Sequence, residues 1–219
     1  MSGSTPLTLA VLISGRGSNM TAIADACQRG ELPARIVSVI ADRPQATGLA
    51  LAQQHNLPTR CVSAADYPQR DDFDADLLAR IRESGAELVI LAGFMRILGA
   101  RFVDSLRDRL LNIHPSLLPQ YRGLHTHRRV LENGETRHGA TVHYVTPELD
   151  GGPRILQGEI AVHADETENA LSARVQAIEH IIYPRVLGWI ASGRLHCSAG
   201  RPQLDGYPLQ QPVLEKFDV

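Results

Sequence analysis

The stretch from Leu7 to Asn19, written LTLAVLISGRGSN, decides what kind of fold this chain can adopt. Its first eight residues are mostly apolar and have the length of a buried strand. The loop GRGSN follows, and from Ser18, an expected N-cap, apolar residues recur at helical spacing until Gly30. The chain is therefore predicted to begin with a strand, a glycine loop and a helix.

The same alternation continues along the chain. Apolar runs of strand length lie at 35–41, 59–63, 87–92 and 110–113. Helical periodicity separates them at 46–55, 67–84 and 100–107. Alternating strands and helices favour parallel strands joined by right-handed crossovers. We therefore predict an α/β fold, with a doubly wound, mostly parallel sheet and helices on both faces.

The C-terminal third has a more mixed pattern. The expected elements are a short helix at 126–132 and strands at 139–145 and 155–162. A long helix is expected to follow, with Asp165 and Glu168 forming a capping arrangement at its start. Pro184 is expected near the end of this helix, because proline interrupts the backbone hydrogen bonds of a helix.

Length and composition predict a single domain spanning 1–219, with 1–6 as a short arm and 193–219 as a tail or hairpin. A net charge of −2, with both signs spread along the chain, favours small-molecule partners over nucleic acid or a membrane. Three widely separated cysteines suit a reducing cytoplasm rather than a disulfide framework. We see no targeting segment or apolar run of membrane-spanning length, so a cytoplasmic protein is expected.

A second stretch, from Asn112 to Pro119, is written NIHPSLLP and continues an apolar run of strand character. Asn112 and His114 have the same parity on an extended strand, so both side chains leave on one face. Pro115 restrains His114 to extended geometry, and Pro119 closes the turn that follows. An amide and an imidazole are thus expected together near the end of a strand.

The segment from Glu148 to Pro153, written ELDGGP, supplies a carboxylate. The two glycines after Asp150 let the backbone approach another segment closely or take a positive φ, which would hold Asp150 beside that strand. An imidazole titrates near neutrality, a carboxylate favours its charged form, and an amide donates to an oxyanion. Either His114 or Asp150 alone is more often a turn residue. The combination with Asn112 predicts a proton-transfer site.

The loop 15–19 lies where open α/β sheets bind ligands, at the carboxyl end of a strand and the start of a helix. Free amides there favour an anion. A dinucleotide fingerprint would need glycine in place of Met20, and a nucleotide phosphate loop would need a Gly-Lys-Ser/Thr ending. A phosphate monoester fits better, and a simple tight turn is the alternative.

Five histidines between positions 114 and 143 invite a metal site. The segment has no HExxH pattern, no cysteine pair and few acidic partners, so no metal is expected and the histidines are predicted to be solvated or bonded in the core. Met95, Ile97 and Leu98 are predicted core residues by composition, and the alternative is the wall of a pocket for a flat organic ligand.

Five motifs spread over nearly the whole chain resemble those of the folate-dependent phosphoribosylglycinamide formyltransferases. They are VLISGRGSN at 11–19, LAGFMRIL at 91–98, LLNIHPSLLP at 110–119, GLHTH at 123–127 and ELDGGP at 148–153. The resemblance implies a formyltransferase fold and transfer of a formyl group from 10-formyltetrahydrofolate to the amine of glycinamide ribonucleotide in purine (IMP) synthesis. It implies no metal, and it leaves open whether the chain forms a homodimer.

The resemblance also implies a role for each matching residue. Gly17, Ser18 and Asn19 would bind the substrate phosphate, and Glu179 would contact the ribonucleotide. The residues implied for folate binding are Arg70, Met95, Arg96, Ile97, Leu98 and Asn112. In the implied catalytic trio, protonated His114 and Asn112 stabilise the tetrahedral oxyanion, while Asp150 keeps His114 protonated.

Three other readings are weaker. A hydrolase that releases formate from the same cofactor usually carries an extra N-terminal domain, for which we expect no room before Leu7. A methionyl-tRNA formyltransferase adds a C-terminal nucleic-acid-binding domain, and a pure binding module would not need the trio. Arg16, Gln120, Arg122 and Arg154 depart from the family pattern beside its motifs, which affects loop detail and phosphate affinity rather than the reaction.

Overall fold

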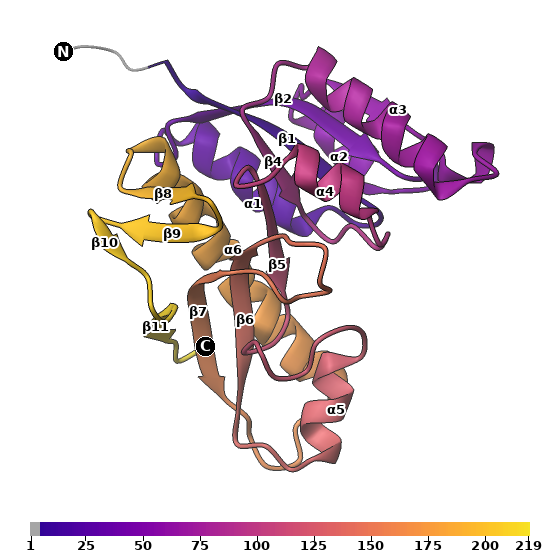
Figure 1. Cartoon of the computed structure of the whole chain (residues 1–219). Coiled ribbons are helices and arrows are strands. Elements are labelled where there is room, and N and C mark those ends of the chain that lie inside the picture. Colours follow the sequence, from indigo (N-terminus) through magenta and orange to yellow (C-terminus); the bar gives the residue numbers. More distant parts are fainter. Residues whose placement is uncertain (1–4) are drawn as a thin grey trace.

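The computed structural model describes residues 5–219, and an eight-stranded sheet runs through its centre (Figure 1). In spatial order its strands are β11 (Val213–Lys216), β7 (Arg154–Ala161), β6 (Arg137–Tyr144), β5 (Leu110–His114), β4 (Leu88–Leu91), β1 (Leu7–Ile13), β2 (Ala34–Ala41) and β3 (Thr59–Cys61). The helices are α1 (Ser18–Gln28), α2 (Gly48–Gln54), α3 (Arg70–Glu83), α4 (Ala100–Ser105), α5 (Thr126–Glu132) and α6 (Glu168–Ala191), with a 3₁₀ turn at Ala64–Asp66. The predicted α/β class is confirmed.

The central strands are apolar throughout because helices cover both faces of the sheet. On β1, Leu9 and Val11 belong to the core shared with α1 and α6. Their neighbours Ala10 and Leu12 belong to the core shared with α3 and α4. Successive side chains of a strand point to opposite faces, so a strand buried on both sides needs a continuous apolar run.

The sheet is mostly parallel, but β6 runs antiparallel to both β5 and β7. This reversal leaves loop 145–153 to connect β6 to β7. The loop crosses in front of β5, while α6 lies behind β5, β6 and β7 (Figure 1). The loop therefore carries Asp150 to the open side of β5.

The long C-terminal helix differs from its prediction at both ends. Its N-cap is Thr167, whose hydroxyl accepts a hydrogen bond from the Ala170 amide, and Asp165 lies outside the helix at φ 62°. The helix also continues through Pro184 to Ala191. Buried apolar residues on both sides of the proline, such as Tyr183 and Val186, hold the helix on the sheet despite the missing backbone donor.

Two other helix starts also differ from the sequence prediction. The expected helix 67–84 is shortened to α3, because Pro68 keeps Tyr67 extended, at φ −116° and ψ 117°. Ser18 is the first residue of α1 rather than its cap, and Gly17 occupies the N-cap position at φ 75°. The loop at 15–19 is therefore tighter than a serine-capped helix start would be.

The C-terminal segment forms a small antiparallel sheet and then joins the large one. The small sheet contains β8 (Leu195–Ser198), β9 (Arg201–Leu204) and β10 (Tyr207–Pro208). The chain then adds β11 parallel to β7. Residues 1–4 of the expected arm lie outside the described residues.

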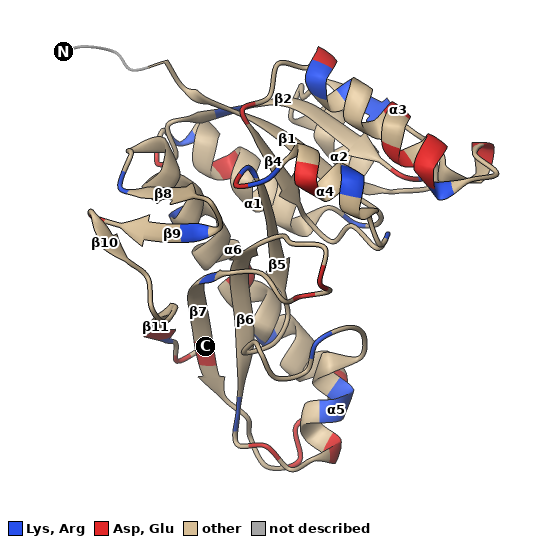
Figure 2. Ribbon diagram, in the orientation of Figure 1, with Lys and Arg blue, Asp and Glu red and all other residues tan. Residues whose placement is uncertain are grey.

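Charges of both signs are interspersed on α3 and α5 (Figure 2).

Candidate active site

The structure places the predicted amide, imidazole and carboxylate together on the open side of β5. Asn112 and His114 belong to β5, and Asp150 comes from the loop after β6. His114 Nδ1 lies 3.5 Å from Asp150 Oδ2, and both side chains are only 8% exposed. The Gly123 amide donates to the same carboxylate oxygen at 2.9 Å. The carboxylate is therefore held in place by a backbone donor.

Both ring nitrogens of His114 face oxygen acceptors. Nε2 lies 2.9 Å from the Tyr121 carbonyl oxygen, which can only accept, so this nitrogen carries a hydrogen. Nδ1 faces the carboxylate of Asp150. At 3.5 Å this contact is longer than a normal hydrogen bond, so the carboxylate acts on the ring mainly as a nearby charge. The ring is therefore held between the Tyr121 carbonyl and the Asp150 carboxylate.

A second histidine fixes the orientation of the Asn112 amide. His143 Nδ1 lies 2.9 Å from the Tyr144 carbonyl oxygen and must donate to it. Burial lowers the pKa of His143 to about 4, so the ring is neutral and Nε2 is an acceptor. Asn112 Nδ2 lies 3.1 Å from this nitrogen and donates one hydrogen to it. The second amide hydrogen remains available to a ligand.

The glycine loop forms one side of a cavity of about 440 Å³, and Ser172, Gln176 and Glu179 of α6 form another. Gly17 is needed here, because its φ is 75° and a Cβ would lie 3.0 Å from the Cα of Gly48. Gln176 Nε2 donates to Ser18 Oγ at 3.0 Å. The start of α1 is thereby tied to α6 across the cavity.

Two buried polar side chains lie in the wall of this cavity. Asn19 Nδ2 donates to Glu179 Oε2 at 2.8 Å, whereas Asn19 Oδ1 has no hydrogen-bond partner within residues 5–219. Burial raises the pKa of Glu179 to about 7. A buried acceptor without a partner is costly, so a ligand hydroxyl or amine that donates to Asn19 Oδ1 would stabilise the site.

A second cavity, of about 470 Å³, contains Asn112, His114 and Asp150 in its wall. Four of its lining residues are exposed apolar side chains: Met95, Ile97, Leu124 and Leu149, which are 64%, 66%, 69% and 54% exposed. Exposed apolar residues that gather around one cavity are typical of a site for an organic ligand. Met95 and Ile97 therefore line a pocket instead of the core.

The two cavities adjoin each other. Gly93, Met95, Ile113, Pro115 and His127 line both of them. The Met95 amide also donates to Ser14 Oγ at 2.8 Å, which joins the apolar loop to the loop that follows β1. A ligand in one cavity would thus meet a ligand in the other beside His114.

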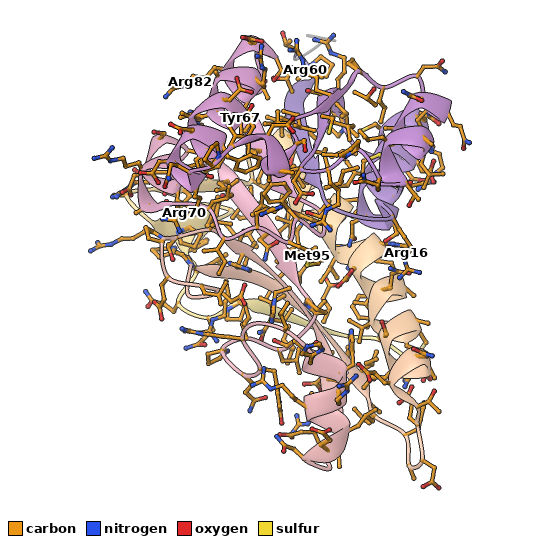
Figure 3. All side chains as sticks on the ribbon, turned by 90° about the vertical axis from the view of Figure 1, so that its right-hand side faces the viewer. Arg16, Arg60, Tyr67, Arg70, Arg82 and Met95 are labelled. Atoms are coloured by element: carbon orange, nitrogen blue, oxygen red, sulfur yellow. The ribbon has the colours of Figure 1, made fainter. Side chains whose placement is uncertain are left out.

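Three residues implied for folate binding are oriented differently from Met95 and Ile97. The Arg96 side chain donates to Asp42 at 3.0 Å, and Leu98 is buried beside a smaller cavity that it shares with Asn112. Arg70 lines a separate cavity of about 420 Å³ with Asp74 and Gly99. Figure 3 shows Arg70 well apart from Met95. The structure does not bring Arg70 to the apolar cavity.

Several groups in the site have no recognisable pattern in the sequence or only a weak one. Two are backbone groups, the Tyr121 carbonyl and the Gly123 amide, and no side-chain pattern reveals them. The third is His143, which pairs with Asn112 across β5 and β6. Its parity on the expected strand 139–145 was a usable signal, because it places the ring on one face with Thr141.

Two findings concern metal binding and membrane-spanning helices. Within residues 5–219, no group of three or more His, Cys, Asp or Glu side chains is arranged to hold a metal ion. No helix in this range has both the length and the apolar character needed to cross a bilayer.

Comparison with known proteins identifies the class to which this fold and site belong. The model of the formyl transferase family matches residues 7–187. The chain therefore belongs to the formyl transferase family.

Within this family, the chain is similar to several individual proteins. The chain is 47% identical to the phosphoribosylglycinamide formyltransferase of Escherichia coli over 203 residues, which cover 93% of this chain and 96% of the relative. It is 38% identical to the enzyme of the same name from Haemophilus influenzae, with 92% and 95% covered. The phosphoribosylglycinamide formyltransferase structure from Coxiella burnetii, in complex with CHES, superposes with a TM-score of 0.91 at 47% identity, with 95% and 99% covered.

Proposed function

We propose that this protein transfers the formyl group of 10-formyltetrahydrofolate to the amine of glycinamide ribonucleotide, giving the N-formyl product and tetrahydrofolate in purine synthesis. The observation that carries this proposal is the meeting of two cavities beside Asn112, His114 and Asp150. One cavity has the polar wall and helix start that suit a phosphate ester, and the other has the apolar wall that suits a folate. The family and relatives of the chain support the same reaction.

In this proposal the ribonucleotide occupies the cavity at the start of α1. Its phosphate accepts hydrogen bonds from the amides of Gly17, Ser18 and Asn19, where the helix dipole favours an anion. Glu179 and Asn19 lie deeper in the wall and contact the sugar or amide portion of the ligand. This placement directs the glycinamide amine toward the second cavity.

The folate occupies the apolar cavity. Its flat ring system packs against the loop of Met95, Arg96, Ile97 and Leu98 and against Leu149. Arg96 contributes mainly through its backbone, because its guanidinium is engaged by Asp42. Arg70 lies outside this cavity, so a contact with Arg70 requires the ligand to extend beyond the loop 94–98.

The chemistry proceeds by attack of the ribonucleotide amine on the formyl carbon. A new C–N bond forms, and the carbonyl oxygen becomes an oxyanion that accepts from the free amide hydrogen of Asn112 and is stabilised by the nearby positive charge of His114. The amine loses a proton, the bond between the formyl carbon and folate nitrogen breaks, and that nitrogen takes up a proton. Asp150 stabilises the His114 imidazolium throughout. Adjacent binding of both substrates makes the attack effectively intramolecular.

The decisive experiment is a formyl-transfer assay on the purified protein. The protein is mixed with 10-formyltetrahydrofolate, and loss of the formyl group is followed by absorbance with and without glycinamide ribonucleotide. Loss that requires the ribonucleotide is the expected result. Loss of the formyl group without the ribonucleotide would instead identify a hydrolase, and no loss in either case would leave a binding protein or an inactive homologue.

The proposal extends to assembly and location. The protein acts in the cytoplasm, where its three unpaired thiols would remain reduced. It assembles as a homodimer, supported by β11, an edge strand of the sheet with Leu214 50% exposed. Light scattering coupled to size-exclusion chromatography measures the mass directly, and a mass of one chain at micromolar concentration would contradict the dimer.

A further inference from the structure

Arg16 is the residue of the glycine loop whose side chain has no role in the fold. It is exposed, and within the described residues its guanidinium makes no hydrogen bond or ion pair. It nevertheless lines the cavity at the start of α1, opposite Ser172 and Gln176 of α6. In Figure 3 it lies beside α6, on the face that also presents Met95. Its guanidinium is therefore free to meet a ligand in that cavity.

The charge of the cavity wall makes this position significant. Its other titratable lining residues are Glu179 and His127. Burial lowers the pKa of His127, so this ring is neutral near pH 7 and adds no positive charge. Among the lining residues that the structure describes, Arg16 is thus the one cationic side chain. A phosphate dianion would otherwise be met only by backbone amides, uncharged side chains and the carboxyl group of Glu179.

An independent observation indicates that this cavity takes a ligand. Asn19 is 7% exposed and lines the cavity, and its Oδ1 has no hydrogen-bond partner within residues 5–219. That oxygen needs a donor such as a sugar hydroxyl, while Arg16 needs an anion. A phosphorylated sugar supplies both groups in one molecule.

We propose that Arg16 binds the phosphate of the ribonucleotide and makes the cavity selective for the phosphorylated substrate over its dephosphorylated form. This inference rests on the proposed function, because it takes glycinamide ribonucleotide as the occupant. The planar guanidinium can donate two parallel hydrogen bonds to phosphate oxygens, which an ammonium cannot do. Arg16 binds and does not catalyse, so its loss affects substrate affinity and not the chemical step.

The test compares Arg16→Gln and Arg16→Lys with the unaltered protein. Titration calorimetry measures the Kd for glycinamide ribonucleotide and for the same compound without its phosphate. Arg16→Gln is expected to raise the Kd and KM for the ribonucleotide about tenfold or more, the range of one charged hydrogen bond, with kcat unchanged. The Kd of Arg16→Lys for the ribonucleotide should lie between those of Arg16→Gln and the unaltered protein. The dephosphorylated compound should bind all three proteins equally.

Arg35→Gln is the matched control. Arg35 is an exposed arginine at the opposite end of the parallel strands, and its substitution removes the same charge from the protein. Equal loss in Arg35→Gln and Arg16→Gln would show a general charge effect and overturn the role of Arg16. The role of Arg16 would also be overturned if Arg16→Gln left the Kd for the ribonucleotide unchanged while the formyl-transfer assay still succeeded. An unaltered protein that binds neither compound would overturn the proposed function and this inference with it.

Discussion

Each nitrogen of the His114 ring lies beside an oxygen of the protein, and this arrangement holds the ring in place next to Asn112. Nε2 donates to the Tyr121 carbonyl, and Nδ1 lies 3.5 Å from the Asp150 carboxylate. His143 is neutral because it is buried, and it only orients Asn112. The two histidines of the site therefore have different roles. His114 acts on the reacting groups, and His143 accepts a hydrogen bond from Asn112.

Replacing His114 by alanine tests the first of these roles. We expect His114→Ala to lower kcat by about two to four orders of magnitude, the range of acid catalysis and oxyanion stabilisation. The assay is the same formyl transfer, and His196→Ala, an exposed histidine on β8, is the control. Turnover within a few-fold of the unaltered protein would remove His114 from the reaction.

Asp150→Asn tests the ion pair. The amide keeps the size of the carboxylate but removes its charge, so a positive charge that develops on His114 during the reaction loses its partner. We expect kcat/KM to fall about tenfold or more at neutral pH and the pH profile of kcat/KM to change. The measurement is kcat/KM from pH 5 to 9, and superimposable profiles would contradict the coupling.

At this scale the sequence located side chains but not their backbone partners. The parity of Asn112 and His114 and the glycines after Asp150 pointed to one cluster, and the structure places these three side chains together. The Tyr121 carbonyl and Gly123 amide could not be predicted, because every residue has such groups and only the path of the chain after Pro119 selects them.

At the scale of elements, local signals failed where tertiary packing outweighed them. The alternation of strands and helices predicted the sheet correctly, because burial on both faces demands continuous apolar runs. Pro184 was expected near the end of α6, yet the helix continues to Ala191, because the core on both sides of the proline keeps it intact. The reversal of β6 left no clear mark in the sequence, since its residues are buried on both faces like those of a parallel strand.

Loop 145–153 depends on a close backbone approach at Gly152. A Cβ at this position would lie 1.8 Å from the Tyr144 carbonyl oxygen, so the strand and loop must separate if alanine is introduced. We expect Gly152→Ala to destabilise the protein by about 1–3 kcal/mol and to lower kcat, because Asp150 moves with the loop. Thermal and urea unfolding measure the first effect.

Gly188→Ala is the control for this prediction. Gly188 lies within α6, and outside the backbone of that helix a Cβ there would meet no heavy atom within 4 Å. This substitution should stabilise the helix by about 0.5–1 kcal/mol and leave turnover unchanged. A Gly152→Ala protein as stable and as active as Gly188→Ala would show that the loop is not held by this approach.

At the scale of the whole molecule, Glu179 links stability to pH. Its pKa is about 7 in the folded protein against an ordinary value of 4.5, so the folded state binds the proton more tightly. The contribution to stability is therefore fully present below about pH 4.5 and is lost as the pH rises to about 7, by up to about 3 kcal/mol. Glu179→Gln stays neutral and should be more stable at pH 8 by about 1–3 kcal/mol.

Urea unfolding at pH 5 and pH 8 checks this prediction. Glutamine retains an oxygen that accepts from Asn19 Nδ2, so the variant isolates the charge. The difference in unfolding free energy between the two proteins should be small at pH 5 and large at pH 8. The same difference at both values would show that Glu179 is ionised throughout. A more stable variant with weaker ribonucleotide binding would mean that the site keeps an unfavourable charge for function.

The hydrogen bond from the Met95 amide to Ser14 Oγ joins the walls of the two cavities. If the ribonucleotide fixes the Ser14 end of this connection, it also prepares the loop that receives the folate. Thermodynamic reciprocity then requires the folate to improve ribonucleotide affinity by the same factor. The two substrates would thus bind cooperatively, and the complex holding both would be populated above the level that independent affinities allow.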